Sequence, residues 1–486
     1  MPFSTYFCKS KQQFFSFMRN VVAIIVFFLL QSVGAYAAKG RIAYPGGKFY
    51  IYRLSLTDKK GSPGTLTNPN KYLSEKALLR RQRQHIAVDS LDLPLSSVYL
   101  NGLRSEGAQV IGGSKWNNTV LVRTKDTTIM TRLRALPYVK SSIRVFKAPD
   151  STTVMLPDDI DKEALGQKAS GDLYGRGAIQ LDMLNGRKVH QAGFRGKGIL
   201  VAVIDGGYMN TDKLARHYHF NIVGQHDCVW PYDDNVYHLL SHGTMVLSTM
   251  ASNADSVFIG TAPDASYLLL RSEDGRSEQL VEEDYWAQAA EYADSAGADI
   301  INSSLGYTIF DDENTSIHYR DQNGKTQLIS RSASTLASRG IVLVCSAGNE
   351  GMKFWKRIGC PADAFDILSV AALSDDSVNA LFSSLGPSID GRVKPDVAAL
   401  GVGATVVNGS GKIIHANGTS FASPILCGMV ACLWQAMPNK TAYEIIDMVK
   451  RAGNRYRHPD NIFGYGIPDF NHILESQRTT IPMPRQ

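Results

Sequence analysis

A serine stands at the head of a long apolar segment, in the sequence GTSFASP at residues 418–424. The leading glycine and the proline predict a turn followed by a helix, with an apolar helical run over 425–437. The free N–H groups and the positive end of such a helix favour negative charge that develops beside them. Ser420 could therefore act as a nucleophile, although a serine that only caps an ordinary helix has the same local pattern.

Three further polar residues adjoin apolar runs. Asp205 ends a β-rich run, His242 precedes an apolar helical run, and Asn349 lies in a loop after another β-rich run. Taken one at a time, Asp205 is consistent with a turn residue, His242 with a residue at a helix start, and Asn349 with a loop amide. Together with Ser420 they supply what acyl transfer needs: a hydroxyl, an imidazole base, a carboxylate that orients the base, and a donor for the oxyanion.

The chain from about Tyr174 to Leu474 alternates short β-rich runs with amphipathic helices. This alternation predicts an α/β fold with a mostly parallel sheet flanked by helices. Such sheets bind ligands beyond the carboxyl ends of their strands, which is where Asp205 and Asn349 are expected. The strands are expected over 199–204, 267–270, 299–303, 341–345 and 367–372, and the helices over 245–251, 282–296, 327–339 and 425–437.

Four stretches resemble the motifs of the subtilisin-like serine proteases. They are VIDGG (203–207), HGT (242–244), SAGNEG (346–351) and GTSFASP (418–424), in the order Asp, His, Ser that this family uses. The resemblance covers about residues 174–474, including FSSLGP (382–387) and KPDV (394–397). It implies a serine endopeptidase with Asp205, His242 and Ser420 as catalytic triad. The Asn349 side chain and the Ser420 backbone N–H would form the oxyanion hole.

The resemblance also implies where a substrate would bind. Ser304-Leu305-Gly306 is similar to the strand that pairs with the backbone of an extended polypeptide, and Gly359 lies in a stretch similar to a wall of the primary specificity pocket. Gly206 departs from the family, many of whose members carry Ser or Thr there. Acidic residues over 273–284 either line the cleft, where they would favour basic substrates, or form a solvated helix start.

Two other classes of protein share part of this pattern. An α/β-hydrolase esterase would need Gly-x-Ser-x-Gly with the histidine last, whereas Ala422 replaces the second glycine and His242 precedes Ser420. A non-catalytic binding protein on the same fold would be expected to have lost part of the triad. All three residue types are present, which favours the protease.

Residues 38–147 are organised differently from the rest of the chain. Strands expected over 49–52, 119–122 and 142–146 and helices over 74–83, 98–106 and 128–136 predict a small α+β domain. Residues 148–173, rich in Asp, Ser, Pro and Gly, are expected to link it to a catalytic domain over 174–486. The resemblance implies that the small domain is the enzyme's own propeptide, removed by cleavage in the linker. A permanently attached domain that binds a substrate or a partner is the alternative.

Residues 1–37 have the features of an export signal. Met18-Arg19-Asn20 precedes the apolar run 21–30, and Ala-Tyr-Ala at 35–37 suits cleavage by signal peptidase. The run is too short to span a membrane as a helix, so no stable membrane anchor is expected, with a retained anchor as the alternative. We therefore expect a protein that is secreted or lies in the periplasm or cell envelope. Met18 is an alternative start codon.

Composition restricts the kinds of partner that the protein is expected to bind. The formal net charge of the 486 residues is +6, and basic and acidic residues are mixed along the chain, so nucleic-acid binding is not expected. No metal ligands are assigned and no cofactor is predicted, although the resemblance leaves a structural calcium ion open. Cys345 and Cys360 could pair or stay free, whereas Cys427 and Cys432 would point to different faces of one helix. The remaining exported cysteine is Cys228.

Overall fold

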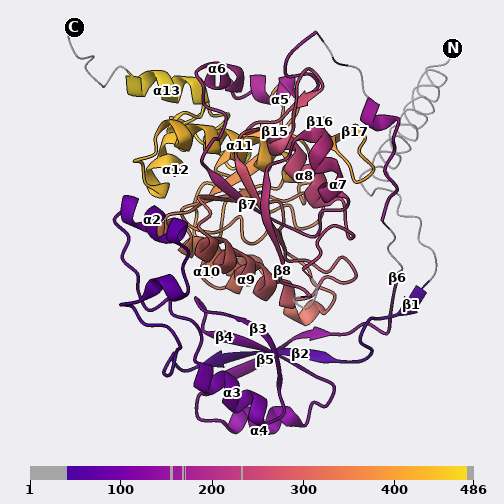
Figure 1. Cartoon of the computed structure of the whole chain (residues 1–486), viewed down its shortest axis with the longest axis vertical. Helices are drawn as coiled ribbons and strands as arrows, with labels where there is room; N and C mark the ends of the chain where they lie inside the picture. The colour runs from indigo at the N-terminus through magenta and orange to yellow at the C-terminus, as the bar shows by residue number, and fades with distance from the viewer. Residues whose placement is uncertain (1–40, 154–156, 167–168, 170, 231–233, 479–486) are drawn as a thin grey trace, which may run out of the picture.

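The structure is a computed structural model of the whole chain. It describes residues 41–153, 157–166, 169, 171–230 and 234–478. The expected export signal, residues 1–37, lies outside the described residues, and so do residues 154–156, 167–168 and 170 of the expected linker. Two domains are visible, a small one at the bottom of Figure 1 and a larger one above it.

The larger domain is built on a seven-stranded sheet with the strand order β15-β14-β13-β12-β7-β11-β8. Every neighbouring pair in this sheet is parallel, which confirms the predicted fold class. The strands are β7 (Leu200–Asp205), β8 (Ile222–Asp227), β11 (Ser266–Arg271), β12 (Ile300–Ser303), β13 (Val342–Ser346), β14 (Leu368–Leu373) and β15 (Val397–Leu400).

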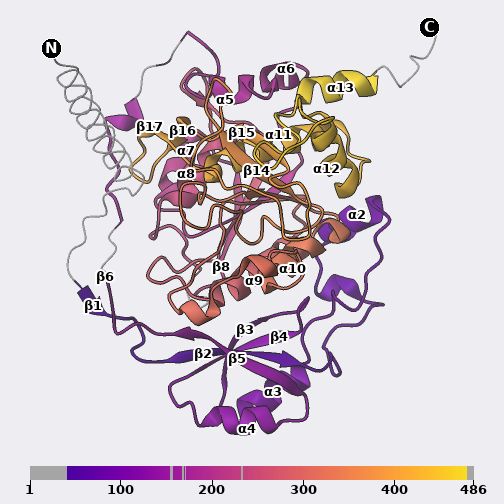
Figure 2. The same cartoon turned by 180° about the vertical axis from the view of Figure 1, so that it is seen from behind.

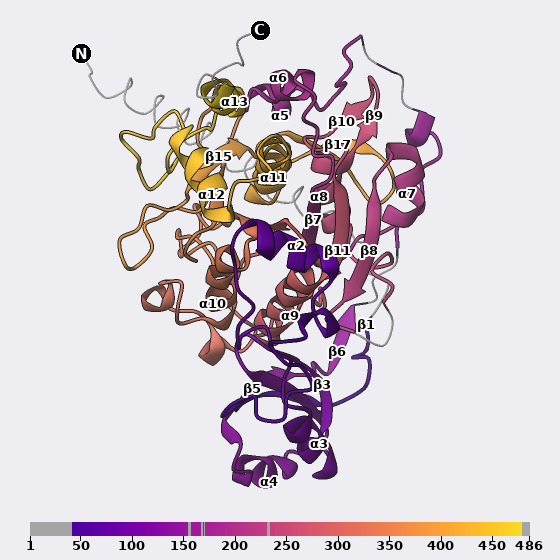
Figure 3. The same ribbon diagram turned by 60° about the vertical axis from the view of Figure 1, so that its left-hand side comes forward.

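Helices cover both faces of this sheet, and the strand sequences reflect it. In β7, Val201 and Val203 pack against α8 (His242–Ala251) and α11 (Thr419–Ala436), whereas Ala202 and Ile204 pack on the side of α9 (Val281–Ala296). Alternate side chains thus enter two different cores, so the run is apolar without interruption. Figure 3 shows α11 end-on within the larger domain, with α9 and α10 (Leu328–Thr335) lower down.

Helix α11 begins six residues before the predicted start at residue 425. It is long and apolar enough to cross a membrane, but it is a core helix of the larger domain and mostly buried. Pro424 therefore lies in the second turn, where its missing N–H would have bonded to the carbonyl of Ser420. That carbonyl instead accepts a hydrogen bond from Ser304 Oγ at 2.8 Å. The proline thus frees an acceptor that ties the helix start to the end of β12.

Shorter elements complete the larger domain. The antiparallel pairs β9–β10 and β16–β17 lie outside the main sheet. Helix α12 has a capping box in which Thr441 and Glu444 bond reciprocally. These elements are α5 (Ala178–Asp182), α6 (Gly186–Gln191), α7 (Thr211–Tyr218), β9 (Asn253–Ala254), β10 (Phe258–Ile259), β16 (Ala404–Val407), β17 (Ile413–Ala416), α12 (Ala442–Arg451) and α13 (Phe470–Arg478).

The small domain is an antiparallel sheet with the order β3-β4-β2-β5, covered on one face by two helices. Its opposite face lies toward α9 (Figure 1). Strand β3 was not predicted, because Gly112 and Gly113 weaken its strand pattern. The elements are β2 (Tyr50–Leu56), α3 (Ser97–Ser105), β3 (Gln109–Ser114), β4 (Thr119–Thr124), α4 (Ile129–Ala135) and β5 (Val139–Lys147). A separate pair, β1 (Arg41–Ala43) with β6 (Ser151–Thr153), joins the two ends of this domain.

Residues 57–96 form an arm that leaves the small sheet and runs along the larger domain. The arm contains the short 3-10 helix η1 (Pro69–Lys71) and α2 (Glu75–Arg83), which reaches the neighbourhood of α12 (Figure 2). Arg80 is fully buried, pairs with Asp294 and donates to the carbonyl of Ala298 at 2.5 Å. Beyond α2, Gln84 accepts a hydrogen bond from the backbone N–H of Ala442 at 2.8 Å. The two domains therefore meet both at the small sheet and along the arm.

Candidate active site

Asp205 and His242 meet at the carboxyl edge of the main sheet. Asp205 is the last residue of β7 and is fully buried, and His242 is the first residue of α8. The Nδ1 atom of His242 lies 2.9 Å from Oδ1 and 3.0 Å from Oδ2 of Asp205. A ring that donates from Nδ1 keeps Nε2 unprotonated when neutral, so Nε2 can accept a proton.

The surroundings of His242 shift its basicity. Burial alone would lower the pKa of His242, but the charge and hydrogen bond of Asp205, with the charge of Glu273, outweigh burial and raise it above the usual value. The ring also packs against Phe421, with 5.9 Å between ring centroids. His242 is thus a base whose protonated form is stabilised by two carboxylates.

Ser420 lies in the first turn of α11 and is mostly buried. Its Oγ donates to the carbonyl of Ser304 at 3.2 Å, and Ser304 Oγ donates to the carbonyl of Ser420 at 2.8 Å. Among the described residues, no hydrogen bond joins Ser420 to His242. Catalytic serine–histidine hydrogen bonds are often long or misaligned before a substrate binds, and a hydroxyl rotates freely.

Asn349 is exposed and lies in the loop after β13, whose turn depends on Gly348, at φ 107°. Its Oδ1 accepts hydrogen bonds from the backbone N–H of Thr419 at 3.0 Å and from Thr419 Oγ1 at 2.9 Å. These two bonds fix which end of the amide faces α11. The NH₂ group has no partner among the described residues, and neither has the backbone N–H of Ser420, so both donors are available to a ligand.

The residues expected to bind the substrate backbone come together in an irregular segment. Ser304-Leu305-Gly306 lies just beyond the end of β12 and does not continue the strand. Tyr307 and Cys360 pair in antiparallel fashion through hydrogen bonds of 2.9 and 3.0 Å, which brings Gly306 close to Gly359. Gly306 is exposed, and its backbone groups have no hydrogen-bond partner within the described part of the chain.

The acidic residues at the start of α9 are not a solvated helix start. Glu282, Glu283 and Asp284 are buried, and Arg53 of β2 donates two hydrogen bonds to Asp284, of 2.7 and 2.6 Å. Burial raises the pKa of Glu283 to about 7, against the opposing charge of Arg53. The solvated alternative is therefore wrong for these residues, because the small domain covers them.

The end of the small domain does not enter the site through its described residues. Phe146 is buried and stacks on Phe49 at 5.3 Å, and the backbone N–H of Lys147 donates to Gln279 at 2.8 Å. Within 148–153 and 157–166, no hydrogen bond reaches Ser304-Leu305-Gly306. Phe146 and Lys147 are therefore part of the interface between the domains and lie outside the candidate active site.

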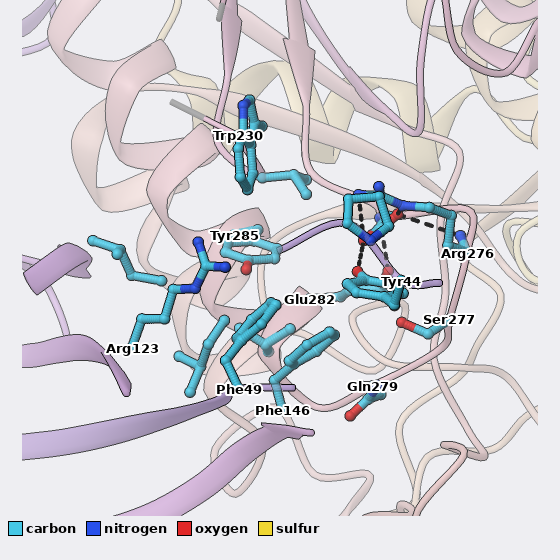
Figure 4. A pocket seen from close by; sticks show the side chains of 16 residues that line it. Tyr44, Phe49, Arg123, Phe146, Trp230, Arg276, Ser277, Gln279, Glu282 and Tyr285 are labelled. Carbon is cyan, nitrogen blue, oxygen red and sulfur yellow. Dashed lines mark hydrogen bonds and ion pairs between the residues drawn. The ribbon is translucent and has the colours of Figure 1, made fainter. Parts of the chain in front are cut away.

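A small cavity of about 40 Å³ lies at that interface (Figure 4). It opens between the small domain and the start of α9, and Tyr44 hydrogen-bonds to Asp274 beside it. None of Asp205, His242 and Ser420 lines it, so it is separate from the candidate active site. Its labelled lining includes Tyr44, Phe49, Arg123, Phe146, Trp230, Arg276, Glu282 and Tyr285.

All five cysteines in the described part of the chain are free and buried. The pairing of Cys345 with Cys360 that the sequence left open is therefore not formed. Burial raises the pKa of the Cys345 thiol to about 12, which disfavours the reactive thiolate.

Comparison with known sequences assigns the class that this site and fold define. The profile of the Subtilase family matches residues 196–466, and that of the Peptidase S8 propeptide domain, Bacteroidota, matches residues 51–157. The chain belongs to the subtilase family and is a serine-type endopeptidase with an N-terminal propeptide domain.

Its relatives include proteases of Bacillus. The chain is 30% identical over 317 residues to serine protease AprX of Bacillus subtilis, covering 58% of this chain and 67% of the relative. It is 29% identical over 281 residues to subtilisin E of the same species, covering 57% and 65%. Among solved structures, the epidermin leader peptide processing serine protease (EpiP) of Staphylococcus aureus superposes with a TM-score of 0.62 at 15% identity, covering 90% of this chain and 100% of that one, a likeness of fold.

Proposed function

We propose that this subtilase is an exported endopeptidase that cleaves peptide bonds by acyl transfer to Ser420. The observation that carries the proposal is the pair of short contacts between His242 Nδ1 and the Asp205 carboxylate, which orients the imidazole beside the first turn of α11, where Ser420 lies. Asp205 would hold the tautomer and stabilise the imidazolium, and His242 would be the general base and then the general acid.

The first chemical step needs one rearrangement of the site. The Ser420 hydroxyl must turn from the Ser304 carbonyl to His242 Nε2, a rotation about a single bond. Its Oγ then attacks the scissile carbonyl carbon while its proton passes to Nε2. The Asn349 NH₂ group and the Ser420 backbone N–H would hold the resulting oxyanion, and the proton on His242 would pass to the leaving amine. A water molecule, activated by His242, releases the acyl group in the second half of the cycle.

The substrate would be a polypeptide in extended conformation. The backbone groups of exposed Gly306, which have no partner among the described residues, can add a strand of substrate backbone, with Gly359 beside the side chain of the scissile residue. Folded proteins seldom offer such a strand, so we expect unfolded or loop segments to be cut first.

Export and a calcium ion remain part of the proposal. The signal-like sequence of residues 1–37 supports secretion or a place in the periplasm or cell envelope. The resemblance to subtilases leaves room for a structural calcium ion, for which we assign no ligands. The propeptide domain would act as an internal partner that limits activity before export is complete.

The test of the assignment is Ser420→Ala. We expect the variant to fold, to lose casein hydrolysis by roughly 10⁶-fold, a figure known from subtilisin itself, and to lose labelling by a fluorophosphonate probe. Ser410→Ala, a serine in the turn between β16 and β17, is the matched control and should keep both properties. Casein cleavage by purified Ser420→Ala at the wild-type rate would refute the assignment.

A further inference from the structure

Gly206, the residue after Asp205, makes room for a carboxylate beside the triad. A β-carbon at this position would lie 3.2 Å from Glu273 Oε2 and 2.8 Å from Leu240 Cδ1. The Ser or Thr that many subtilases carry here would therefore displace at least one of these side chains. The departure noted in the sequence thus coincides with a glutamate that occupies the space the larger residue would take.

Glu273 is held at one oxygen only. Tyr307, the residue after Gly306, donates its hydroxyl to Glu273 Oε1 at 3.0 Å. Glu273 Oε2 has no hydrogen-bond partner among the described residues, and the side chain is half-buried. The residue therefore offers one fixed oxygen and one open oxygen.

No Lys or Arg among the described residues forms an ion pair with this carboxylate, although the charges of His242 and Arg271 partly lower its pKa. The neighbouring Arg271 is engaged elsewhere, because it donates to Asp227 at 2.7 Å and to the carbonyl of Gly206 at 3.1 Å. Burial and the charge of Asp205 raise the pKa of Glu273 to about 7. A cationic partner would stabilise the ionised form of a carboxyl group in such surroundings.

The location of Glu273 indicates which substrate side chain it would face. Tyr307 connects it to the segment Ser304-Leu305-Gly306, and Gly206 connects it to Asp205 and the triad. Successive side chains of an extended peptide point to opposite sides. If the scissile residue points toward Gly359, the residue before it points back toward His242 and Glu273.

We propose that Glu273 is a specificity-determining residue that binds a lysine or arginine side chain on the substrate residue immediately before the scissile residue. The inference rests on the proposed function, since it needs the substrate to lie along Ser304-Leu305-Gly306. The Lys ammonium or Arg guanidinium would donate to Oε2, while Tyr307 keeps Oε1 in place. The enzyme would then favour peptides with a basic residue at that one position.

The experiment compares two quenched fluorescent peptides that differ only in this residue, Lys in one and Leu in the other. Enzyme purified after expression of the full chain should cleave the Lys peptide with at least roughly tenfold higher kcat/KM, as expected for one charge-assisted hydrogen bond. In Glu273→Gln the ratio should fall to near one while the Leu peptide is still cleaved. Because both peptides are measured with the same enzyme sample, any loss of folded protein lowers both rates equally and leaves their ratio unchanged.

Two further variants sharpen the result. Gly206→Ser, which places a side chain against Glu273, should lower the ratio as well. Asp447→Asn removes an exposed carboxylate of α12 that pairs with Arg451, far from Gly206 and Tyr307 in the fold, and it should leave the ratio unchanged. An equal ratio in wild type and Glu273→Gln, or a wild-type preference for Leu, would overturn the inference alone. Failure to cleave either peptide would overturn the proposed function and the inference with it.

Discussion

At the scale of single residues, the candidate site depends on how each polar group is oriented. Asn349 is exposed, yet two hydrogen bonds from Thr419 hold its carbonyl oxygen against the start of α11. The NH₂ group must then face away from Thr419, as an oxyanion donor requires. The proposed nucleophile, Ser420, and the proposed oxyanion donor, Asn349, are therefore aligned by adjacent residues of one helix.

The acid limb of the pH–activity profile should report His242. The base must be neutral, so activity is present above its pKa and lost as pH falls through it. Because the pKa of His242 is raised, we expect the midpoint in kcat/KM for the Leu peptide to lie above about 6.5. Glu273→Gln removes one of the charges that raise the pKa, so its midpoint should move to lower pH. A wild-type midpoint below 6.5, or an unmoved midpoint in the variant, would contradict this account.

At the scale of elements, a buried charge cluster fastens the end of the sheet to α12. Asp396, just before β15, is buried and pairs with Lys394 and with Lys450 of α12, both at 2.7 Å. It also accepts hydrogen bonds from the N–H and hydroxyl of Ser369. Burial alone would raise the pKa of Asp396, but the two lysines hold it well below its usual range.

Asp396→Asn should lower the free energy of unfolding by about 3–5 kcal/mol, because it leaves a buried lysine without its counter-charge. The carboxylate's contribution is present above the unfolded-state pKa, near 3.9, and is lost as pH falls through the lower native pKa. The difference between the two proteins should thus shrink below about pH 4. Urea unfolding in the Ser420→Ala background, which prevents autolysis, measures it.

The control is Asp390→Asn, which removes a more exposed ion pair with Arg392 and should cost less than about 1 kcal/mol. Equal effects of the two substitutions would show that burial of Asp396 is not what makes it important.

The sequence predicted the fold class and five strands of the main sheet because buried parallel strands read as continuous apolar runs. It missed β8, which is a partly exposed edge strand with the sequence IVGQHD, and β15, which is only four residues long. It placed the start of α11 too late because a proline usually marks a first turn. The role of Pro424 was not visible locally, because the carbonyl of Ser420 that it leaves free bonds to Ser304, 116 residues away in sequence.

Contacts between segments that lie far apart in the sequence could likewise not be predicted from local sequence patterns. Asp205 and His242 were expected to approach each other, since a strand end and a helix start at one sheet edge bring them together. Nothing local indicated that α2 would leave the small domain, or that Arg53 would cover Asp284. The acidic run was therefore given a solvated alternative, which the structure excludes for Glu282, Glu283 and Asp284.

At the scale of the whole molecule, the linker should be cut by the enzyme itself. We expect wild-type protein to accumulate as a fragment that starts between Ala148 and Asp172, because the linker is polar and its described residues are largely exposed. Ser420→Ala should stay full length apart from removal of the signal. Mass spectrometry of both proteins, made in a host lacking other proteases, checks this. A fully active wild-type enzyme that starts at Ala38, or equal processing of Ser420→Ala, would show instead that the domain is permanent.

The arm would hold the small domain in place after such a cut. Cleavage in the linker leaves the contacts of Arg80 and Gln84 intact, so the domain becomes a separate chain that is still bound. Its association then changes from an intramolecular to a bimolecular equilibrium, and an effective concentration on the order of millimolar gives way to the actual concentration outside the cell. Ion pairs such as Arg80–Asp294 and Arg53–Asp284 form part of the contact, and these charged groups can be hydrated once the surfaces separate. Dilution after export would then set how much enzyme is free.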